Sequence, residues 1–190
     1  GDTKMHVSVI IPNWNGKHLL KTCLKSLRAQ TFKGFETFVI DNGSVDGSIE
    51  YINRYFPEVK VVSLDRNYGF AKAVNEGIKQ SSGKYVVLIN NDTEVDKKCL
   101  HYLVNAANKH KDVGFVATKM LNFYKRDIID STGDWVDIAG HASNRGLGEK
   151  DGPKFNIPGY VFLVTGGGGL FKREVFKKVG YYRETDRPAE

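Results

Sequence analysis

Two hydrophobic patterns alternate along the first 120 residues of the chain. Short runs rich in Val, Ile and Phe, such as residues 7–11 and 85–89, have the length and composition of buried strands. Between these runs, apolar residues recur every three or four positions, which is typical of helices with one buried face. The pattern predicts strands at 7–11, 35–40, 59–64, 85–89 and 113–118, and helices at 17–30, 49–56, 70–78 and 100–107.

Regular alternation of strands and helices with short connections predicts βαβ units and a parallel sheet. Because such crossovers are right-handed, we expect an α/β fold: a Rossmann-like, doubly wound, mostly parallel sheet with helices on both faces. After about residue 120 the pattern weakens, and glycines and polar residues dominate 130–160. Here we predict short strands at 135–138 and 160–164, one helix at 171–179, and extended loops that face a ligand.

The composition is that of one globular domain, with 190 residues, 41% apolar and 26% charged. The formal charge of +6 suits a phosphate-bearing ligand, nucleic acid or an anionic membrane without deciding among them. Lys and Arg are scattered and no nucleic-acid motif is present, so we expect no nucleic-acid partner. No apolar run approaches the roughly 20 residues of a spanning helix. With no leader pattern and only Cys23 and Cys99 as cysteines, a cytoplasmic protein is expected.

Four loops rich in Asp, Asn and Gly follow the first four predicted strands. Ligands of open parallel sheets bind outside the carboxyl ends of the strands, so the fold brings these loops into one crevice. Each loop alone is weak evidence, since Asn and Gly are common in any turn. The loops are 12–16, 41–47, 65–69 and 90–96.

The residue types in these loops suggest the ligand. The loop that starts Asp41-Asn-Gly-Ser44 offers a carboxylate, which pairs with a ring N–H of uracil or thymine or with sugar hydroxyls. The row Asn90-Asn91-Asp92 offers hard oxygen ligands, which suit Mg²⁺ or Mn²⁺. A divalent metal there could tie a diphosphate to the protein, with Arg66 near the same mouth. The interpretation is a nucleoside diphosphate held across strands one, two and four.

The ordered set of these segments resembles family 2 glycosyltransferases of the GT-A fold, in particular bacterial rhamnosyltransferase-like members. The resemblance rests on Val-Ser-Val-Ile-Ile-Pro-Asn-Trp-Asn-Gly, Val-Ile-Asp-Asn-Gly-Ser-Val-Asp-Gly-Ser, Asn-Tyr-Gly-Phe-Ala-Lys-Ala-Val-Asn-Glu-Gly and Leu-Ile-Asn-Asn-Asp-Thr, in that order over about residues 5–120. The later segment 166–180, which begins Gly-Gly-Gly-Gly-Leu-Phe, resembles the one leading to the acceptor side. On this reading residues 1–120 are the nucleotide-sugar-binding half, and 121–190 are a partial acceptor-side half of the same domain.

The resemblance implies an inverting transfer of a sugar from a UDP- or dTDP-linked donor to a glycan or lipid-linked acceptor. Peripheral association with the inner face of the membrane is a further expectation, because family acceptors are often lipid-linked. The expected metal is Mg²⁺ or Mn²⁺, held by Asp92. The expected nucleotide-binding residues are Pro12, Asn13, Asn15, Asp41, Asn67, Asn90 and Asn91.

Two departures from the family pattern bear on the chemistry. Asn90 replaces the first carboxylate of the family's DxD motif, so metal affinity is expected to depend on the bound diphosphate. The family's catalytic base lies in an acidic pair shortly after the position of Gly180. Here Glu190 is the only candidate for its first member, the catalytic residue is otherwise unassigned, and the native chain is expected to continue further.

Two other nucleotide-binding classes would carry a different loop after the first strand. A dehydrogenase would carry a Gly-rich fingerprint after the first strand, and a sugar nucleotidyltransferase would carry a Gly-rich basic loop there. Residues 12–16 match neither. The nucleotidyltransferase stays as a distant alternative because it shares the substrate class. A donor-binding but catalytically silent domain remains the main alternative.

Overall fold

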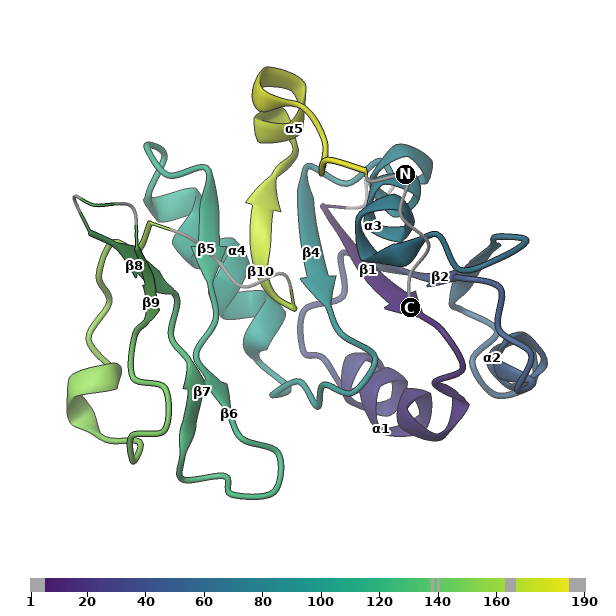
Figure 1. Cartoon of the computed structure of the whole chain (residues 1–190), viewed down its shortest axis with the longest axis horizontal. Helices are drawn as coiled ribbons and strands as arrows, with labels where there is room; N and C mark the ends of the chain where they lie inside the picture. Colours follow the sequence, from purple (N-terminus) through teal and green to yellow (C-terminus); the bar gives the residue numbers. More distant parts are fainter. Residues whose placement is uncertain (1–5, 138, 140, 163–166, 185–190) are drawn as a thin grey trace.

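The computed structural model describes residues 6–137, 139, 141–162 and 167–184 of the chain (Figure 1). Six strands form one sheet in the order β3-β2-β1-β4-β10-β5. Strands β3, β2, β1 and β4 are parallel, whereas β10 runs antiparallel to both of its neighbours. The predicted α/β fold with a mostly parallel sheet is therefore confirmed. The sheet consists of β1 (Val7–Asn13), β2 (Phe35–Asp41), β3 (Lys60–Ser63), β4 (Tyr85–Ile89), β5 (Phe115–Ala117) and β10 (Gly168–Lys172).

Helices cover both faces of this sheet, as the doubly wound prediction requires (Figure 1). On one face, Leu24, Ile52 and Leu103 of three helices belong to the same buried cluster. On the other face, Val74 and Phe176 anchor two helices in a second cluster. The first group is α1 (Lys17–Arg28), α2 (Ser48–Tyr55) and α4 (Cys99–Lys109), and the second is α3 (Gly69–Gln80) and α5 (Arg173–Val179).

The central strands read as continuous apolar runs because both of their faces are covered. In β1, Val9 and Ile11 point into the first cluster, and Ile10 between them points into the second. All five residues of β4 are buried. Parallel pairing places Asn13 beside Asp41, so the first two loops start side by side.

The strand β10 corrects the prediction for the glycine-rich segment. Sequence periodicity predicted a helix at 171–179, but Phe171 and Lys172 end β10, and α5 begins only at Arg173. The strand inserts between β4 and β5, and Leu170 is fully buried. Gly168 has no room for a side chain, since a Cβ there would lie 2.8 Å from the Thr118 hydroxyl. Gly168 thus allows a close approach of protein groups.

The region between β5 and β10 contains short antiparallel pairs. The predicted strand at 135–138 corresponds to β8, whereas the described part of the predicted strand 160–164 is not a strand, and its remainder lies outside the described residues. Large apolar side chains here, including Ile157 and Tyr160, are about two-thirds exposed. The elements are β6 (Met120–Leu121), β7 (Ile129–Ser131), β8 (Asp134–Val136), β9 (Ala142–Asn144) and the short 3₁₀ helix η1 (Pro153–Phe155).

A buried polar cluster closes the edge of the sheet opposite the four loops. Glu36 accepts hydrogen bonds from the Ser8 hydroxyl at 2.7 Å and from Lys60 Nζ at 2.8 Å. The backbone N–H of Ser82 also donates to it, at 3.3 Å. Burial by itself raises the pKa of Glu36, but these hydrogen bonds outweigh burial and hold the pKa below its ordinary value.

Both cysteines are free thiols. Burial raises the pKa of Cys23 to about 12 and that of Cys99 to about 11, so both stay protonated at neutral pH.

Within the described ranges, no helix combines the length and apolar character needed to span a bilayer.

Candidate functional site

The four predicted loops emerge from one edge of the sheet, at the carboxyl ends of β1, β2, β3 and β4 (Figure 1). Two of these strands end on polar residues, Asn13 and Asp41, which are almost completely buried. A buried carboxylate needs hydrogen-bond donors, and here the neighbouring loops supply them. The loops are therefore joined to one another by side chains.

Asp41 is the centre of these connections. One of its carboxylate oxygens accepts from Asn13 Nδ2 at 3.0 Å. The other accepts from the backbone N–H of Ser44 at 2.8 Å, which closes the turn after β2. The Asp41 side chain is fully buried, so a ligand contacts it only if neighbouring groups move.

The loop after β4 joins the same network through Asn91. Its Nδ2 donates to Asn13 Oδ1 at 2.8 Å, so Asn13 uses its amide oxygen toward one loop and its amide nitrogen toward another. Gly16 lies against both amides, and a Cβ at Gly16 would clash with the Asn91 side chain. Asn91, Asn13 and Asp41 form a continuous chain of hydrogen bonds across β4, β1 and β2, which we call the loop network.

Asn15 lies in the left-handed backbone region, with φ at 48°. Asn tolerates this conformation better than most residues, which explains its presence in the tight turn after β1. Its N–H donates to Ser44 Oγ at 2.8 Å, and its Oδ1 accepts from the N–H of Val45 at 2.9 Å. The side chain of Asn15 thus holds the loop after β2.

Pro12 is partly buried at the penultimate position of β1.

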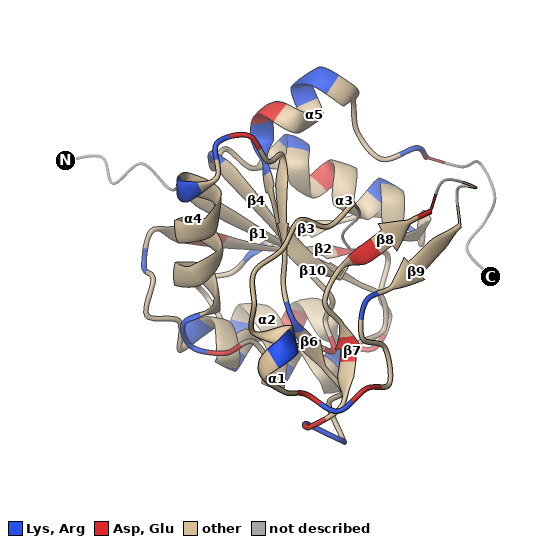
Figure 2. Ribbon diagram, turned by 90° about the vertical axis from the view of Figure 1, so that its left-hand side faces the viewer, with Lys and Arg blue, Asp and Glu red and all other residues tan. Residues whose placement is uncertain are grey.

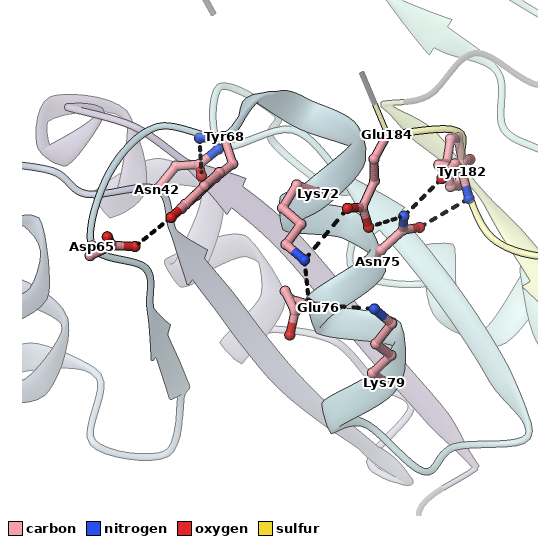
Figure 3. Close-up of polar contacts among 9 residues, drawn as sticks. All are labelled: Asn42, Asp65, Tyr68, Lys72, Asn75, Glu76, Lys79, Tyr182 and Glu184. Atoms are coloured by element: carbon pink, nitrogen blue, oxygen red, sulfur yellow. Dashed lines mark hydrogen bonds and ion pairs between the residues drawn. The ribbon is translucent and has the colours of Figure 1, made fainter. Parts of the chain in front are cut away.

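The loop after β3 is held by Asn42, which the sequence analysis did not single out (Figure 3). Its Oδ1 accepts from the N–H of Tyr68, and its Nδ2 donates to the carbonyl of Gly69, both at 3.1 Å. Asn67 makes a local contact instead, because its Oδ1 accepts from the N–H of Gly69 at 2.9 Å. The structure therefore does not join Asn67 to the loop network. The sequence feature that could have indicated the role of Asn42 is its position directly after Asp41.

Asn90 and Asp92 are exposed in the loop after β4. The Cys23 thiol donates to the carbonyl of Asn90 at 3.7 Å, and after burial the Asp92 carboxylate is the second cause of its raised pKa. Gly167 has no space for a side chain because the Asn90 amide lies against it. The chain just before β10 is therefore a direct neighbour of this loop.

The described residues could hold a divalent metal only together with a bound ligand that supplies further coordinating atoms. Within the described residues, no group of three His, Cys, Asp or Glu side chains could hold a metal ion. Asp92 is the single carboxylate of its triplet, and the nearby Glu94 is paired with Arg126 at 2.5 Å. Mg²⁺ is commonly bound by one or two carboxylates together with substrate phosphates and water. Asp92 fits that mode, in which a diphosphate supplies the missing ligands.

The chain after α5 is fastened to α3 by the buried residue Asn75 (Figure 3). Asn75 Oδ1 accepts from the N–H of Tyr182 at 3.0 Å, and its Nδ2 donates to the Tyr182 carbonyl and to Glu184 Oε1, both at 2.8 Å. Glu184 also lies 3.5 Å from Lys72, one turn nearer the start of α3. The segment 181–184 thus runs along α3 toward the loop edge. The candidate base Glu190 lies outside the described residues.

The fold matches solved GT-A glycosyltransferases. TarS of S. aureus, solved in complex with UDP-GlcNAc, is 21% identical with a TM-score of 0.70 and covers 94% of this chain and 48% of its own. The mannosyltransferase PcManGT of Pyrobaculum calidifontis, solved with GDP-Man and Mn²⁺, is 21% identical with a TM-score of 0.68 and covers 94% and 47%. At these sequence identities, the structural similarity establishes the fold alone.

The family follows from the sequence. The profile of Glycosyl transferase family 2 matches residues 8–180, nearly the whole chain, and the protein belongs to that family. The poly-beta-1,6-N-acetyl-D-glucosamine synthase of Staphylococcus epidermidis is 27% identical over 186 residues, which are 97% of this chain and 43% of that protein. The chain thus spans less than half the length of this relative. The family prediction is confirmed, and the likeness to rhamnosyltransferases stays a prediction.

Proposed function

We propose that this domain transfers a sugar from a nucleoside-diphosphate sugar to a hydroxyl of a glycan or lipid-linked acceptor, with inversion. The observation that carries the proposal is the loop network, which ties three loops into one preformed edge. Family membership supports the reaction class. The ligands of the structural relatives, UDP-GlcNAc in TarS and GDP-Man in PcManGT, support the donor class.

The nucleoside end of the donor lies against Pro12, Asn13, Asn15 and Asp41 in this proposal. A carboxylate has about four acceptor positions, and the contacts to Asn13 and Ser44 use two of those on Asp41. The others are left to accept from a ring N–H once the groups that cover Asp41 move. Asn90 and Asn91 face the ribose and the diphosphate, while Asn67 flanks the nucleotide from the third loop.

The chemical step is a single displacement at the anomeric carbon. An acceptor oxygen forms the new bond, the bond to the diphosphate oxygen breaks, and a general base takes the acceptor proton. Asp92 is the residue that would hold Mg²⁺ or Mn²⁺, which supplies charge neutralisation for the departing diphosphate. PcManGT was solved with Mn²⁺, which supports this choice. The general base itself is unassigned, with Glu190 as its candidate.

The principal alternative is a domain that binds the donor but does not transfer the sugar. The loop network is compatible with a transferase and with a silent domain, because it bears on donor binding and not on the catalytic base. A nucleotidyltransferase is less favoured, since the first loop lacks the basic glycine-rich sequence that a triphosphate requires. A cytoplasmic location and peripheral contact with the membrane complete the proposal.

Calorimetric titration tests donor binding directly. UDP, dTDP and GDP are titrated into the protein with Mn²⁺, with Mg²⁺ and with EDTA. The proposal predicts saturable binding of at least one diphosphate that weakens in EDTA. A folded protein that binds none of the three under any condition would refute it. Release of free sugar or formation of product from the matching donor then separates a transferase from a silent domain.

A further inference from the structure

The helices α1 and α2 enclose a groove of about 900 Å³ on the outer surface of the protein. One end of the groove reaches the loop after β2, at Ser44, Val45 and Gly47. The rest follows the two helices away from the four loops. The groove therefore shares the loop after β2 with the candidate nucleotide site and otherwise lies outside it.

Positive charge is concentrated along this groove. Lys17, Lys21 and Lys25 follow one another at intervals of four residues, so they share one face of α1 at a spacing of about 6 Å. Lys and Arg positions on α1 are visible in Figure 2. Arg54 lines the groove from α2, and Glu50 is the one acidic residue among the lining groups.

Most of these cations make no ion pair within the described part of the chain, and the nearest carboxylate that lines the groove is Glu50, which lies beside Lys17 at Gly47. Arg28, at the far end, is paired with Glu58 at 2.7 Å. No described carboxylate lies within salt-bridge distance of Lys17, Lys21, Lys25 or Arg54. Like charges four residues apart disfavour a helix by about 0.2–0.5 kcal/mol per pair. An anion in the groove would relieve this repulsion.

The opposite wall of the groove is aromatic. Tyr51, Tyr55 and Phe56 line it, and the rings of Tyr51 and Tyr55 lie 5.0 Å apart. Tyr55 is half exposed, and Val45 at the mouth is 90% exposed. Tyr side chains with one apolar and one polar end are suited to a boundary between apolar and charged groups. The groove thus offers lysines for an anion and the exposed ring of Tyr55 for an adjoining apolar part.

We propose that the groove between α1 and α2 is a second binding site, which takes a phosphate group. The concave shape suits a headgroup that enters between the helices, and the lysine row gives the phosphate several charged donors. The same phosphate chemistry could come from a lipid headgroup or from a soluble phosphate chain. This proposal stands independently of nucleotide binding at the loop edge.

Vesicle binding with two charge-matched variants tests the site. Co-sedimentation with phosphatidylglycerol vesicles and with phosphatidylcholine vesicles is compared for wild type, Lys21→Glu/Lys25→Glu and Lys177→Glu/Lys178→Glu. Both double variants change the net charge equally, at exposed helix positions. Each lysine near an anionic surface contributes about fivefold to affinity. Thermal unfolding establishes that both variants fold.

The expected result is binding to phosphatidylglycerol vesicles that the α1 variant loses by about 25-fold or more. The α5 variant should lose less than about threefold, since its lysines lie outside the groove. Calorimetry with tripolyphosphate identifies the source of the phosphate. Saturable binding that the α1 variant loses shows that phosphate suffices, and binding to vesicles alone shows that a lipid headgroup is required. Equal losses in both variants, or no binding of either probe by wild type, would overturn the proposal.

Discussion

The loop edge of the sheet and the segment 118–162 differ in how their polar and apolar groups are arranged. At the loop edge, Asn13 and Asp41 are buried and joined by side-chain hydrogen bonds. In the segment 118–162, strands are two or three residues long, and Trp135, Leu147 and Ile157 expose large apolar surfaces. The first region is preorganised by its own contacts. The second has apolar surface available for contact with other groups.

The difference suggests a division of labour within the domain. An edge held by its own hydrogen bonds suits a defined ligand such as a nucleotide, because most of the edge is ordered before binding and only the groups that cover Asp41 have to move. Loosely packed hairpins suit a variable partner, which agrees with the proposed acceptor side. The division into residues 1–120 and 121–190 therefore remains our proposal. Matched substitutions in the two regions test it.

The largest effect is expected from Asp41→Ala. The substitution removes the acceptor for Asn13 and for the N–H of Ser44, and each donor left unpaired costs about 1–3 kcal/mol. We expect the free energy of unfolding to fall by about 2–5 kcal/mol and nucleotide affinity to fall with or without metal. Denaturant unfolding and calorimetry measure both. Asp151→Ala, which removes a partly exposed ion pair with Lys119, should cost about 1 kcal/mol or less.

Gly16→Ala comes next. The added methyl group would clash with the Asn91 amide, and overpacking of this kind costs about 1–3 kcal/mol. Gly152→Ala is the counterpart in the second region, where a Cβ has no neighbour within 4 Å and the backbone is extended. Its unfolding free energy should stay within about 0.5 kcal/mol of wild type. Equal effects of the two substitutions would contradict the claim that the loop edge is the tighter region.

Asn75→Ala should release the segment 181–184 from α3. Tyr182 loses both backbone partners, so we expect a loss of about 1–3 kcal/mol and faster hydrogen exchange of the Tyr182 amide. Asn105→Ala is the control, because Asn105 is exposed on α4 and bonds only His101 among the described residues. If the Tyr182 amide exchanges at the wild-type rate in Asn75→Ala, Asn75 does not hold this segment.

A smaller effect is expected from pH. The folded pKa of Glu36 is lowered, so its contribution to stability is present above the pKa of the unfolded chain and is lost as pH falls through the folded pKa. Wild type should therefore lose stability on acidification below about pH 4.5. Glu36→Gln should show a flatter curve over the same range in denaturant unfolding. A steeper curve for the variant would show that the pKa of Glu36 is raised instead.

The smallest effect on stability is expected from Asp92→Ala, because the side chain is exposed. Its unfolding free energy should change by less than about 0.5 kcal/mol. Nucleotide affinity with Mn²⁺ should fall to the value measured in EDTA, and affinity in EDTA should not change. Glu94→Ala removes a neighbouring carboxylate that pairs with Arg126, and it should keep the metal dependence. A variant at Asp92 that retains full metal dependence removes this residue from the metal site.

The sequence predicts most of the first region because its signals are local. Buried parallel strands are continuous apolar runs, and the helices show one apolar face, so 85–89 matched β4 in full. The candidate residues Asn13, Asp41 and Asn91 could be placed on one edge from the fold rule alone. Their mutual hydrogen bonds, and the role of Asn42, depend on side-chain directions that no pattern in the chain specifies.

The second region was harder to predict because its structure depends on contacts distant in sequence. β10 pairs with β4 and β5 from more than 50 residues away, and its sequence Gly-Gly-Leu-Phe-Lys has no clear strand period. Its glycines are explained only by the groups that lie against them, such as Thr118. The role of Asn75 likewise depends on contacts distant in sequence, because its partners are Tyr182 and Glu184.

Amide hydrogen exchange in the presence and absence of UDP and Mn²⁺ can locate the bound nucleotide on the protein. If the nucleotide binds at the loop edge, added protection should be confined to the loops at 12–16, 41–47, 65–69 and 90–96. Protection mainly within 118–162 or along the groove between α1 and α2, with these four loops unchanged, would contradict binding at the loop edge.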